Sequence, residues 1–201
     1  MFIVFEGVDG SGKDTQLLKV LEYLKQRNKN LQFFLTKEPT GNTKSGKEIL
    51  QKLKSTGFSS AKEALDLYVK DREEQSVLRK EILKHSIILS TRFDYSTYAY
   101  QGASGLSFDE IYSSHNYKNI LIPDITFLFD VSKENIENRL KKRGGEKETF
   151  EEIDFLLKVR EKYLETFENL KDKRTIYLID ANKSIEETFL QIKNILDNYN
   201  F

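Results

Sequence analysis

The stretch Gly7-Val8-Asp9-Gly10-Ser11-Gly12-Lys13-Asp14-Thr15 decides the fold of this chain. It fits the pattern G-x-x-x-x-G-K-[ST] except at the last position, where Asp14 stands in place of a hydroxyl. The apolar run Phe2–Phe5 precedes it and leucines recur at helical spacing over Leu17–Leu24, so the loop joins a buried strand to a helix. There, backbone amides and the helix N-terminus surround phosphate oxygens, and Lys13 reaches the outer phosphates. The stretch predicts a nucleotide-binding protein.

The composition predicts a single domain over residues 1–201 and limits the kinds of partner that it could bind. A chain of 201 residues is long enough to bury a sizeable core. Lys+Arg and Asp+Glu each number 32, and a net charge of zero argues against a nucleic-acid or membrane-surface binder. The absence of cysteine fits a reducing compartment. No apolar leader precedes the first strand, so we expect a cytoplasmic protein.

Apolar segments of strand length alternate with longer segments of helical periodicity. The expected strands are Phe2–Glu6, Leu31–Thr36, Ser86–Ser90, Ile125–Asp130 and Thr175–Asp180. Continuous apolar strands that alternate with helices are typical of a parallel sheet covered on both faces. Ser107 and Ser184 each precede a glutamate by three residues, a spacing that predicts capped helix starts. The sequence therefore predicts an α/β fold with a five-stranded parallel sheet and helices on both faces.

The segment 139–150 is dense in cations and contains Gly144-Gly145 before the next helical pattern. One interpretation is a solvated helix end, with cations near the C-terminus and a glycine stop. The other is a short basic lid, because phosphoryl transfer needs cations over the moving group. With a phosphate loop already in the chain, we favour the lid.

Five blocks in order give the chain an end-to-end resemblance to the thymidylate kinase family. The blocks are Phe5–Lys13, Lys37–Pro39, Asp71–Gln75, Arg92–Gly102 and Pro123–Val131. The resemblance implies a P-loop kinase fold and transfer of the γ-phosphoryl group of ATP to dTMP, which gives ADP and dTDP. It also implies Mg²⁺ as cofactor and a homodimer.

The resemblance assigns nine residues to the dTMP site. They are Asp9, Glu38, Pro39, Tyr68, Arg72, Arg92, Ser96, Thr97 and Tyr100. Asp9 would accept a hydrogen bond from the sugar 3′-hydroxyl, and Arg92 would grip the acceptor phosphate. Tyr68 would stack on thymine and Arg72 would donate to its carbonyl. Tyr100 would lie against the sugar and disfavour a 2′-hydroxyl.

The resemblance also assigns the ATP site and the catalytic cations. The expected ATP residues are Gly7, Gly10, Ser11, Gly12, Lys13, Asp14, Thr15, Arg139, Arg143 and Ala181, and the expected catalytic residues are Lys13, Arg92, Arg143 and Lys147. Neither His85 nor His115 is near a motif, so both are expected to be structural or solvated. The acceptor oxygen is already ionised, so positioning and charge neutralisation suffice.

Three positions depart from the family pattern. Asp14 occupies the hydroxyl position of the loop, and Thr91 stands where an aspartate normally precedes the arginine that Arg92 matches. We expect the two to have exchanged roles in holding Mg²⁺, with independent drift as the alternative. Lys147 stands where a lid arginine is usual, and Arg143 is the alternative for that role.

Two other functions stay open at this point. One is a kinase of the same fold that acts on another nucleoside monophosphate or on a deoxynucleoside. The other is a non-catalytic nucleotide-binding relative with an altered Mg²⁺ site. The joint presence of Lys13, Asp9 and Arg92 argues for a catalyst, because a pure nucleotide binder needs no acceptor site.

Overall fold

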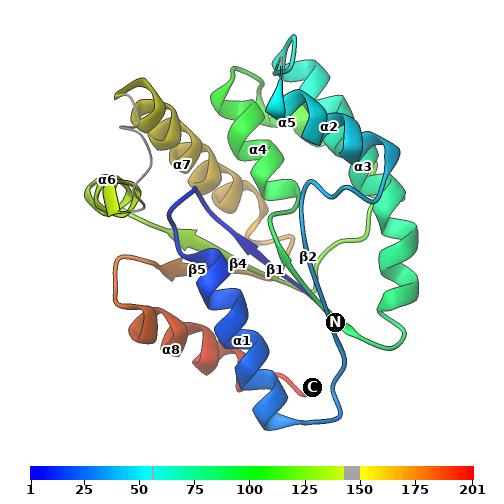
Figure 1. Cartoon of the computed structure of the whole chain (residues 1–201), viewed down its shortest axis with the longest axis vertical. Coiled ribbons are helices and arrows are strands. Elements are labelled where there is room, and N and C mark those ends of the chain that lie inside the picture. Colours follow the sequence, from blue (N-terminus) through cyan, green and yellow to red (C-terminus); the bar gives the residue numbers. More distant parts are fainter. Residues whose placement is uncertain (56, 143–149) are drawn as a thin grey trace.

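The computed structural model describes every residue except 56 and 143–149, and the side chains of 140–142 and 150–152 are likewise outside the description. Its strands are β1 (Phe2–Glu6), β2 (Phe33–Lys37), β3 (Ile87–Thr91), β4 (Ile125–Asp130) and β5 (Ile176–Asp180). They form a five-stranded sheet in the order β2-β3-β1-β4-β5, and every pairing is parallel. The predicted parallel sheet is confirmed (Figure 1).

Three strands, β2, β3 and β5, begin later than the sequence predicts, because the chain before each is still held in a turn. The amide of Leu31 donates to the carbonyl of Asn28, so β2 begins at Phe33. The amide of Ser86 donates to the carbonyl of Ile82, so β3 begins at Ile87. The amide of Arg174 donates to the carbonyl of Leu170, and β5 begins at Ile176, one residue after the predicted start.

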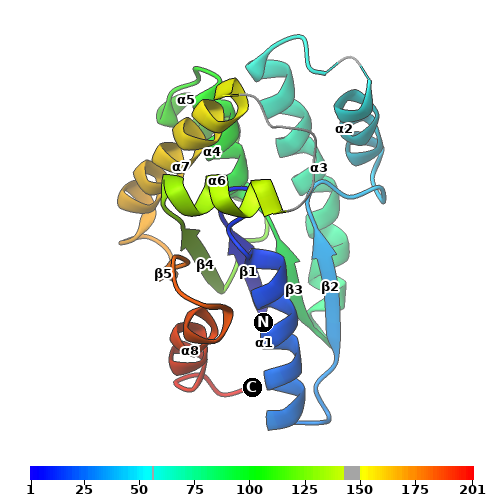
Figure 2. The ribbon, with the colours of Figure 1, turned by 60° about the vertical axis from the view of Figure 1, so that its left-hand side comes forward.

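Helices cover both faces of the sheet. They are α1 (Lys13–Arg27), α2 (Lys44–Lys54), α3 (Ala61–Ile82), α4 (Asp94–Ala103), α5 (Phe108–Ser114), α6 (Lys133–Lys142), α7 (Phe150–Leu170) and α8 (Ile185–Leu196). Figure 1 shows α1 and α8 on one face, and α3, α4 and α7 on the other. Figure 2 shows α6 across the carboxyl end of the sheet. No helix in the described part of the chain is long and apolar enough to cross a membrane.

The buried strands fix the position of the carboxyl end of the sheet. The polar residues of the site lie at this end. All five residues of β1 and of β3 are buried. Because parallel strands end at the same edge, the segments after β1, β2, β3 and β5 meet there. The predicted caps of α5 and α8 are confirmed, since Ser107 and Ser184 each form a complete capping box.

Candidate functional site

The loop after β1 wraps its backbone around the start of α1. Gly12 precedes the helix with φ of 89°, a left-handed conformation that favours glycine. At Gly7 a side chain would lie 2.9 Å from the carbonyl oxygen of Phe129, so the loop approaches β4 too closely for any other residue. The predicted strand-loop-helix arrangement is therefore present, with the helix N-terminus open toward the sheet edge.

The Lys13 side chain folds back over this loop and is almost completely buried. Its Nζ lies 3.4 Å from the carbonyl oxygen of Val8 and 3.5 Å from a carboxylate oxygen of Asp9. Burial lowers the pKa of the ammonium, and the nearby guanidinium of Arg92 lowers it further. A second negative group next to Lys13, such as a phosphate, would offset both effects.

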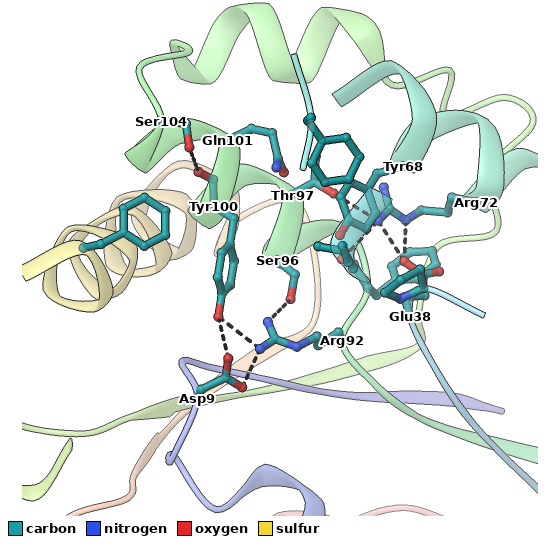
Figure 3. A pocket seen from close by; sticks show the side chains of 15 residues that line it. Asp9, Glu38, Tyr68, Arg72, Arg92, Ser96, Thr97, Tyr100, Gln101 and Ser104 are labelled. Carbon is teal, nitrogen blue, oxygen red and sulfur yellow. Dashed lines mark hydrogen bonds and ion pairs between the residues drawn. The ribbon is translucent and has the colours of Figure 1, made fainter. Parts of the chain in front are cut away.

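A cavity of about 460 Å³ opens between the loop, α3 and α4 (Figure 3). All nine residues that the sequence assigns to the dTMP site line it. The lining also includes six residues that the sequence analysis leaves out: Leu53, Phe58, Phe93, Gln101, Ser104 and Phe155. Gln101 and Ser104 follow Thr97 at helical spacing, so their shared face could have been predicted. Phe155 comes from α7 and carries no such signal.

Arg92 lies at the wall of this cavity in a strained backbone conformation. It is the only non-glycine residue with positive φ in the described chain, at 67°. Its guanidinium donates to Asp9 at 2.7 Å, to the hydroxyl of Tyr100 at 3.0 Å and to Oγ of Ser96 at 3.2 Å. The guanidinium carbon also lies 4.9 Å from the centre of the Tyr100 ring. Arg92 is thus held at the cavity by contacts to two other segments.

The Asp9 carboxylate joins this cluster from the loop. Burial raises its pKa, but the charges of Arg92 and Lys13 outweigh burial and hold the pKa below its usual range. Its second oxygen accepts from the Tyr100 hydroxyl at 3.2 Å. Burial raises the pKa of Tyr100 to about 12, so the hydroxyl stays protonated at neutral pH. The cluster combines one anion with two cations, which favours the binding of a further anion.

Arg72 is at the opposite end of the cavity, 1% exposed. Its Nε and Nη2 donate to one oxygen of Glu38 at 3.0 and 2.8 Å, and Nη2 also lies 3.1 Å from Oγ1 of Thr97. Nη1 lies 2.9 Å from Nε2 of His115. A guanidinium carries five N–H groups, and these contacts leave one Nη1 hydrogen for a ligand.

His115, expected from the sequence to be structural or solvated, is buried behind the cavity and contacts Arg72. Because Arg72 can only donate, Nε2 of His115 must accept, and its Nδ1 donates to the carbonyl of Ile111 at 2.7 Å. Burial lowers the pKa of His115 to about 4, so the ring is neutral at physiological pH. The ring stacks with those of Tyr98 and Tyr117. Local sequence gives no sign of this contact, since 43 residues separate the pair.

A second cavity of about 300 Å³ lies on the other side of the loop. Six of the predicted ATP residues line it: Gly10, Ser11, Gly12, Thr15, Arg139 and Ala181. Arg139 connects its walls by donating to the carbonyl of Gly10 at 3.1 Å and that of Ala181 at 2.5 Å. Four residues outside the predicted set also line this cavity: Gln16, Lys183, Ile185 and Thr188.

The predicted magnesium pair has one exposed and one buried member. Asp14 is exposed on the first turn of α1 and has no ion-pair partner among the described residues, whereas Thr91 is buried at the end of β3. No cluster of three metal-ligating side chains occurs within residues 1–55, 57–142 and 150–201. Magnesium commonly binds one or two carboxylates together with substrate phosphates, and the exposed carboxylate of Asp14 is of the kind that such a site uses.

The predicted lid, residues 139–150, falls mostly outside the described residues. Only its first residues, Arg139 to Lys142, and its last, Phe150, lie within α6 and α7. The candidate catalytic residues Arg143 and Lys147 are outside the described part of the chain, so their roles stay predictions.

Comparison with known proteins gives one family. The family model described as thymidylate kinase matches residues 5–192. The thymidylate kinase of Mesoplasma florum is 39% identical over 206 residues, which cover 98% of this chain and 94% of that protein. The thymidylate kinase of Thermosipho melanesiensis is 35% identical and covers 98% of both chains. The crystal structure of the thymidylate kinase from Ehrlichia chaffeensis matches 98% of both chains with a TM-score of 0.73 and 26% identity.

Proposed function

The chain belongs to the thymidylate kinase family, and we propose that it transfers the γ-phosphoryl group of ATP to dTMP at the two cavities beside the phosphate loop. In this arrangement dTMP occupies the cavity between the loop, α3 and α4, and ATP occupies the cavity at Arg139 and Ala181. The chain acts as a nucleoside monophosphate kinase within a single domain, residues 1–201.

The observation that carries this proposal is that successive residues of the phosphate loop line different cavities. Asp9 lines the first cavity and Gly10, the next residue, lines the second. The ammonium of Lys13 lies 3.5 Å from Asp9, at the boundary between them. Two substrates bound on either side of this boundary would bring their phosphates together over one cation, which is what direct transfer requires.

On the acceptor side, Arg92 binds the phosphate of dTMP. A guanidinium makes two parallel hydrogen bonds to phosphate, and at neutral pH the acceptor oxygen needs no general base. Tyr100 already contacts Arg92 and Asp9, and its ring lies against the deoxyribose. The ring leaves no room for a 2′-hydroxyl, and Asp9 accepts from the 3′-hydroxyl.

At the far end of the cavity, Arg72 and Tyr68 bind the base. The remaining Nη1 hydrogen of Arg72 donates to a thymine carbonyl, and Tyr68 stacks on the ring. The side chain of Arg72 is fixed by Glu38 and His115, so it cannot turn to suit a different base. A base with an amino group in place of that carbonyl would set donor against donor, which disfavours cytosine.

On the donor side, the backbone of Gly7–Gly12 and the side chain of Lys13 bind the phosphates of ATP, and Arg139 flanks the adenosine. Asp14 and Thr91 would hold Mg²⁺, with Asp14 as the carboxylate and Thr91 as the hydroxyl. When bound, the metal neutralises phosphate charge. Without it, Asp14 would repel the same phosphates. Arg143 or Lys147 would add a cation from the lid.

We also retain the homodimer and the cytoplasmic location as part of the proposal. Two side chains of α3, Val77 and Leu78, are 71% and 50% exposed and offer an apolar surface for a second copy. Light scattering of the purified protein measures the mass directly, and a monomer at micromolar concentration would contradict the dimer.

The experiment that tests the proposed function is release of ADP from ATP, with and without dTMP, in the unaltered protein and in Lys13→Ala. We expect dTMP-dependent ADP release that Lys13→Ala abolishes. Binding of ATP with no turnover of any monophosphate would instead indicate a nucleotide-binding protein without kinase activity.

A further inference from the structure

Glu6, the last residue of β1, is a fully buried carboxylate that the roles described above do not use. One oxygen accepts from the amides of Phe93 and Ser96 at 2.6 and 3.2 Å. The other accepts from the hydroxyls of Ser96 and Tyr163 at 2.7 and 3.1 Å. No described cation forms an ion pair with Glu6, so these hydrogen bonds, together with the more distant charge of Arg92, stabilise its charge. Burial raises its pKa accordingly.

The two amides that Glu6 binds, those of Phe93 and Ser96, are among the four at the start of α4 that have no partner within the helix. The N-cap residue of α4 is Phe93, which has no side-chain oxygen to accept them. In the described part of the chain, five other helices are capped by the side chain that directly precedes them, those of Thr43, Ser60, Ser107, Ser132 and Ser184. For α4 the capping side chain is Glu6 of β1, which lies 87 residues before Phe93 in the chain.

This cap fixes the backbone of Arg92, which directly precedes Phe93. The amide of Arg92 donates to the carbonyl of Phe5 at 2.9 Å, and its own carbonyl accepts from Oγ of Ser90 at 3.0 Å. With the Phe93 amide bound to Glu6, the polar groups on both sides of Arg92 are held. A left-handed conformation at a non-glycine residue costs free energy and persists only where the surroundings fix it.

Glu6 also acts on the guanidinium of Arg92 through one intervening side chain. Oγ of Ser96 donates to Glu6 and accepts from Nη1 of Arg92 at 3.2 Å, a contact that Figure 3 shows. A hydroxyl that donates to a carboxylate becomes a better acceptor for a cation. The charge of Glu6 thus orients Arg92 although the two side chains do not touch.

We propose that Glu6 is a positioning residue for phosphoryl-acceptor binding. It caps α4 from β1, holds the backbone of Arg92 in its left-handed conformation and, through Ser96, aims the guanidinium into the acceptor cavity. This inference rests on the proposed function, because it assigns the acceptor phosphate to Arg92.

The test compares the binding of dTMP with that of thymidine, which lacks the phosphate, in Glu6→Gln. Glutamine keeps the shape and the capping oxygen and removes the charge. We expect the Kd of dTMP to rise about tenfold or more, the order of one charge-assisted hydrogen bond. The Kd of thymidine should stay within about twofold, because thymidine makes no use of Arg92.

Two matched variants separate positioning from helix capping. Ser107→Ala removes an ordinary cap, that of α5, so it should lower stability and leave the Kd of dTMP unchanged. Ser96→Ala breaks the link between Glu6 and Arg92 while both charges remain. It should raise the Kd of dTMP several-fold more than the Kd of thymidine, and it serves as the test even if Glu6→Gln does not fold.

In an Arg92→Ala background, Glu6→Gln should have no further effect on the Kd of dTMP. Equal losses of dTMP and thymidine in Glu6→Gln and Ser96→Ala, or a full additional loss in the Arg92→Ala background, would overturn the inference. If the unaltered protein binds dTMP and these variants match it, only the inference is wrong. If the unaltered protein binds neither ligand, the proposed function is wrong and the inference falls with it.

Discussion

The guanidinium of Arg92 donates to the carboxylate of Asp9 at 2.7 Å, across 83 residues of sequence. This contact joins the end of β3 to the phosphate loop, so the acceptor cavity and the loop are one connected structure. Under the proposed function, the phosphate of dTMP competes with Asp9 for Arg92. Asp9 is then released toward the sugar, where the proposed function needs it.

Arg92→Ala should impair the acceptor side alone. Loss of a charge-assisted contact to phosphate costs on the order of a hundredfold or more in kcat/KM for dTMP. The affinity for ATP should be nearly unchanged, because Arg92 does not line the second cavity. Steady-state kinetics and ATP titration measure both quantities. The control is Arg27→Ala, at an arginine that contacts the chain's C-terminal segment. Normal dTMP kinetics with weakened ATP binding would reverse the assignment of the cavities.

Tyr100 should determine the choice between deoxyribose and ribose. In the unaltered protein, dTMP should be the best acceptor and UMP much the poorer, with dUMP as the comparison that isolates the 2′-hydroxyl. Tyr100→Ala should raise the kcat/KM ratio of UMP to dUMP by about tenfold or more, since a steric barrier is removed. Tyr100→Phe keeps the ring and should keep the preference. If UMP and dUMP turn over equally well in the unaltered protein, Tyr100 has no such role.

Most of the fold follows from sequence patterns, because it depends on local periodicity and short motifs. The apolar run of β1 and the glycines of the loop are each readable within a few residues. The three strand starts that differ follow turn hydrogen bonds, at Leu31, Ser86 and Arg174, that periodicity does not show.

For the candidate site too, the sequence predicts some features and not others. The family blocks bring together the nine acceptor residues, and the structure places all nine around one cavity. The contacts that hold those residues were not predictable, since they join distant segments. Glu6 reaches Phe93 across the sheet edge, and His115 reaches Arg72 from the end of α5.

Asp14 and Thr91 should behave as a coupled pair. If they have exchanged the usual hydroxyl and carboxylate, Asp14→Thr and Thr91→Asp should each lower kcat, and Asp14→Thr, which removes the carboxylate, should also weaken the dependence on Mg²⁺. The double variant restores the common arrangement and should recover much of the activity. A double-mutant cycle on kcat/KM, repeated over a Mg²⁺ titration, measures the coupling. Purely additive losses would indicate independent drift.

His115 should make stability fall as the pH falls below neutral. Its pKa is about 4 in the folded protein, because burial and Arg72 outweigh the opposing charge of Asp94, and about 6.5 when unfolded. Between these values the unfolded chain binds more protons, so the free energy of unfolding decreases as the pH falls. From about pH 7 to pH 5 we expect a loss of about 2 kcal/mol.

Urea unfolding of His115→Gln at both pH values tests this, with His85→Gln as the control at the exposed second histidine. Glutamine places an acceptor at the position of Nε2, so the contact to Arg72 can persist. The pH-dependent loss should shrink by about 2 kcal/mol in His115→Gln and persist in His85→Gln. The same loss in both variants would place the titrating group elsewhere.

The most direct test of the central claim is the kcat/KM of the purified protein for each acceptor, with ATP and Mg²⁺. The panel is dTMP, dUMP, UMP, dCMP, dAMP, dGMP and thymidine. We predict that dTMP is the best acceptor, that dCMP and the purine nucleotides are poor, and that thymidine accepts no phosphoryl group. A higher kcat/KM for any other member of the panel, or ATP binding without turnover of any of them, would contradict the account.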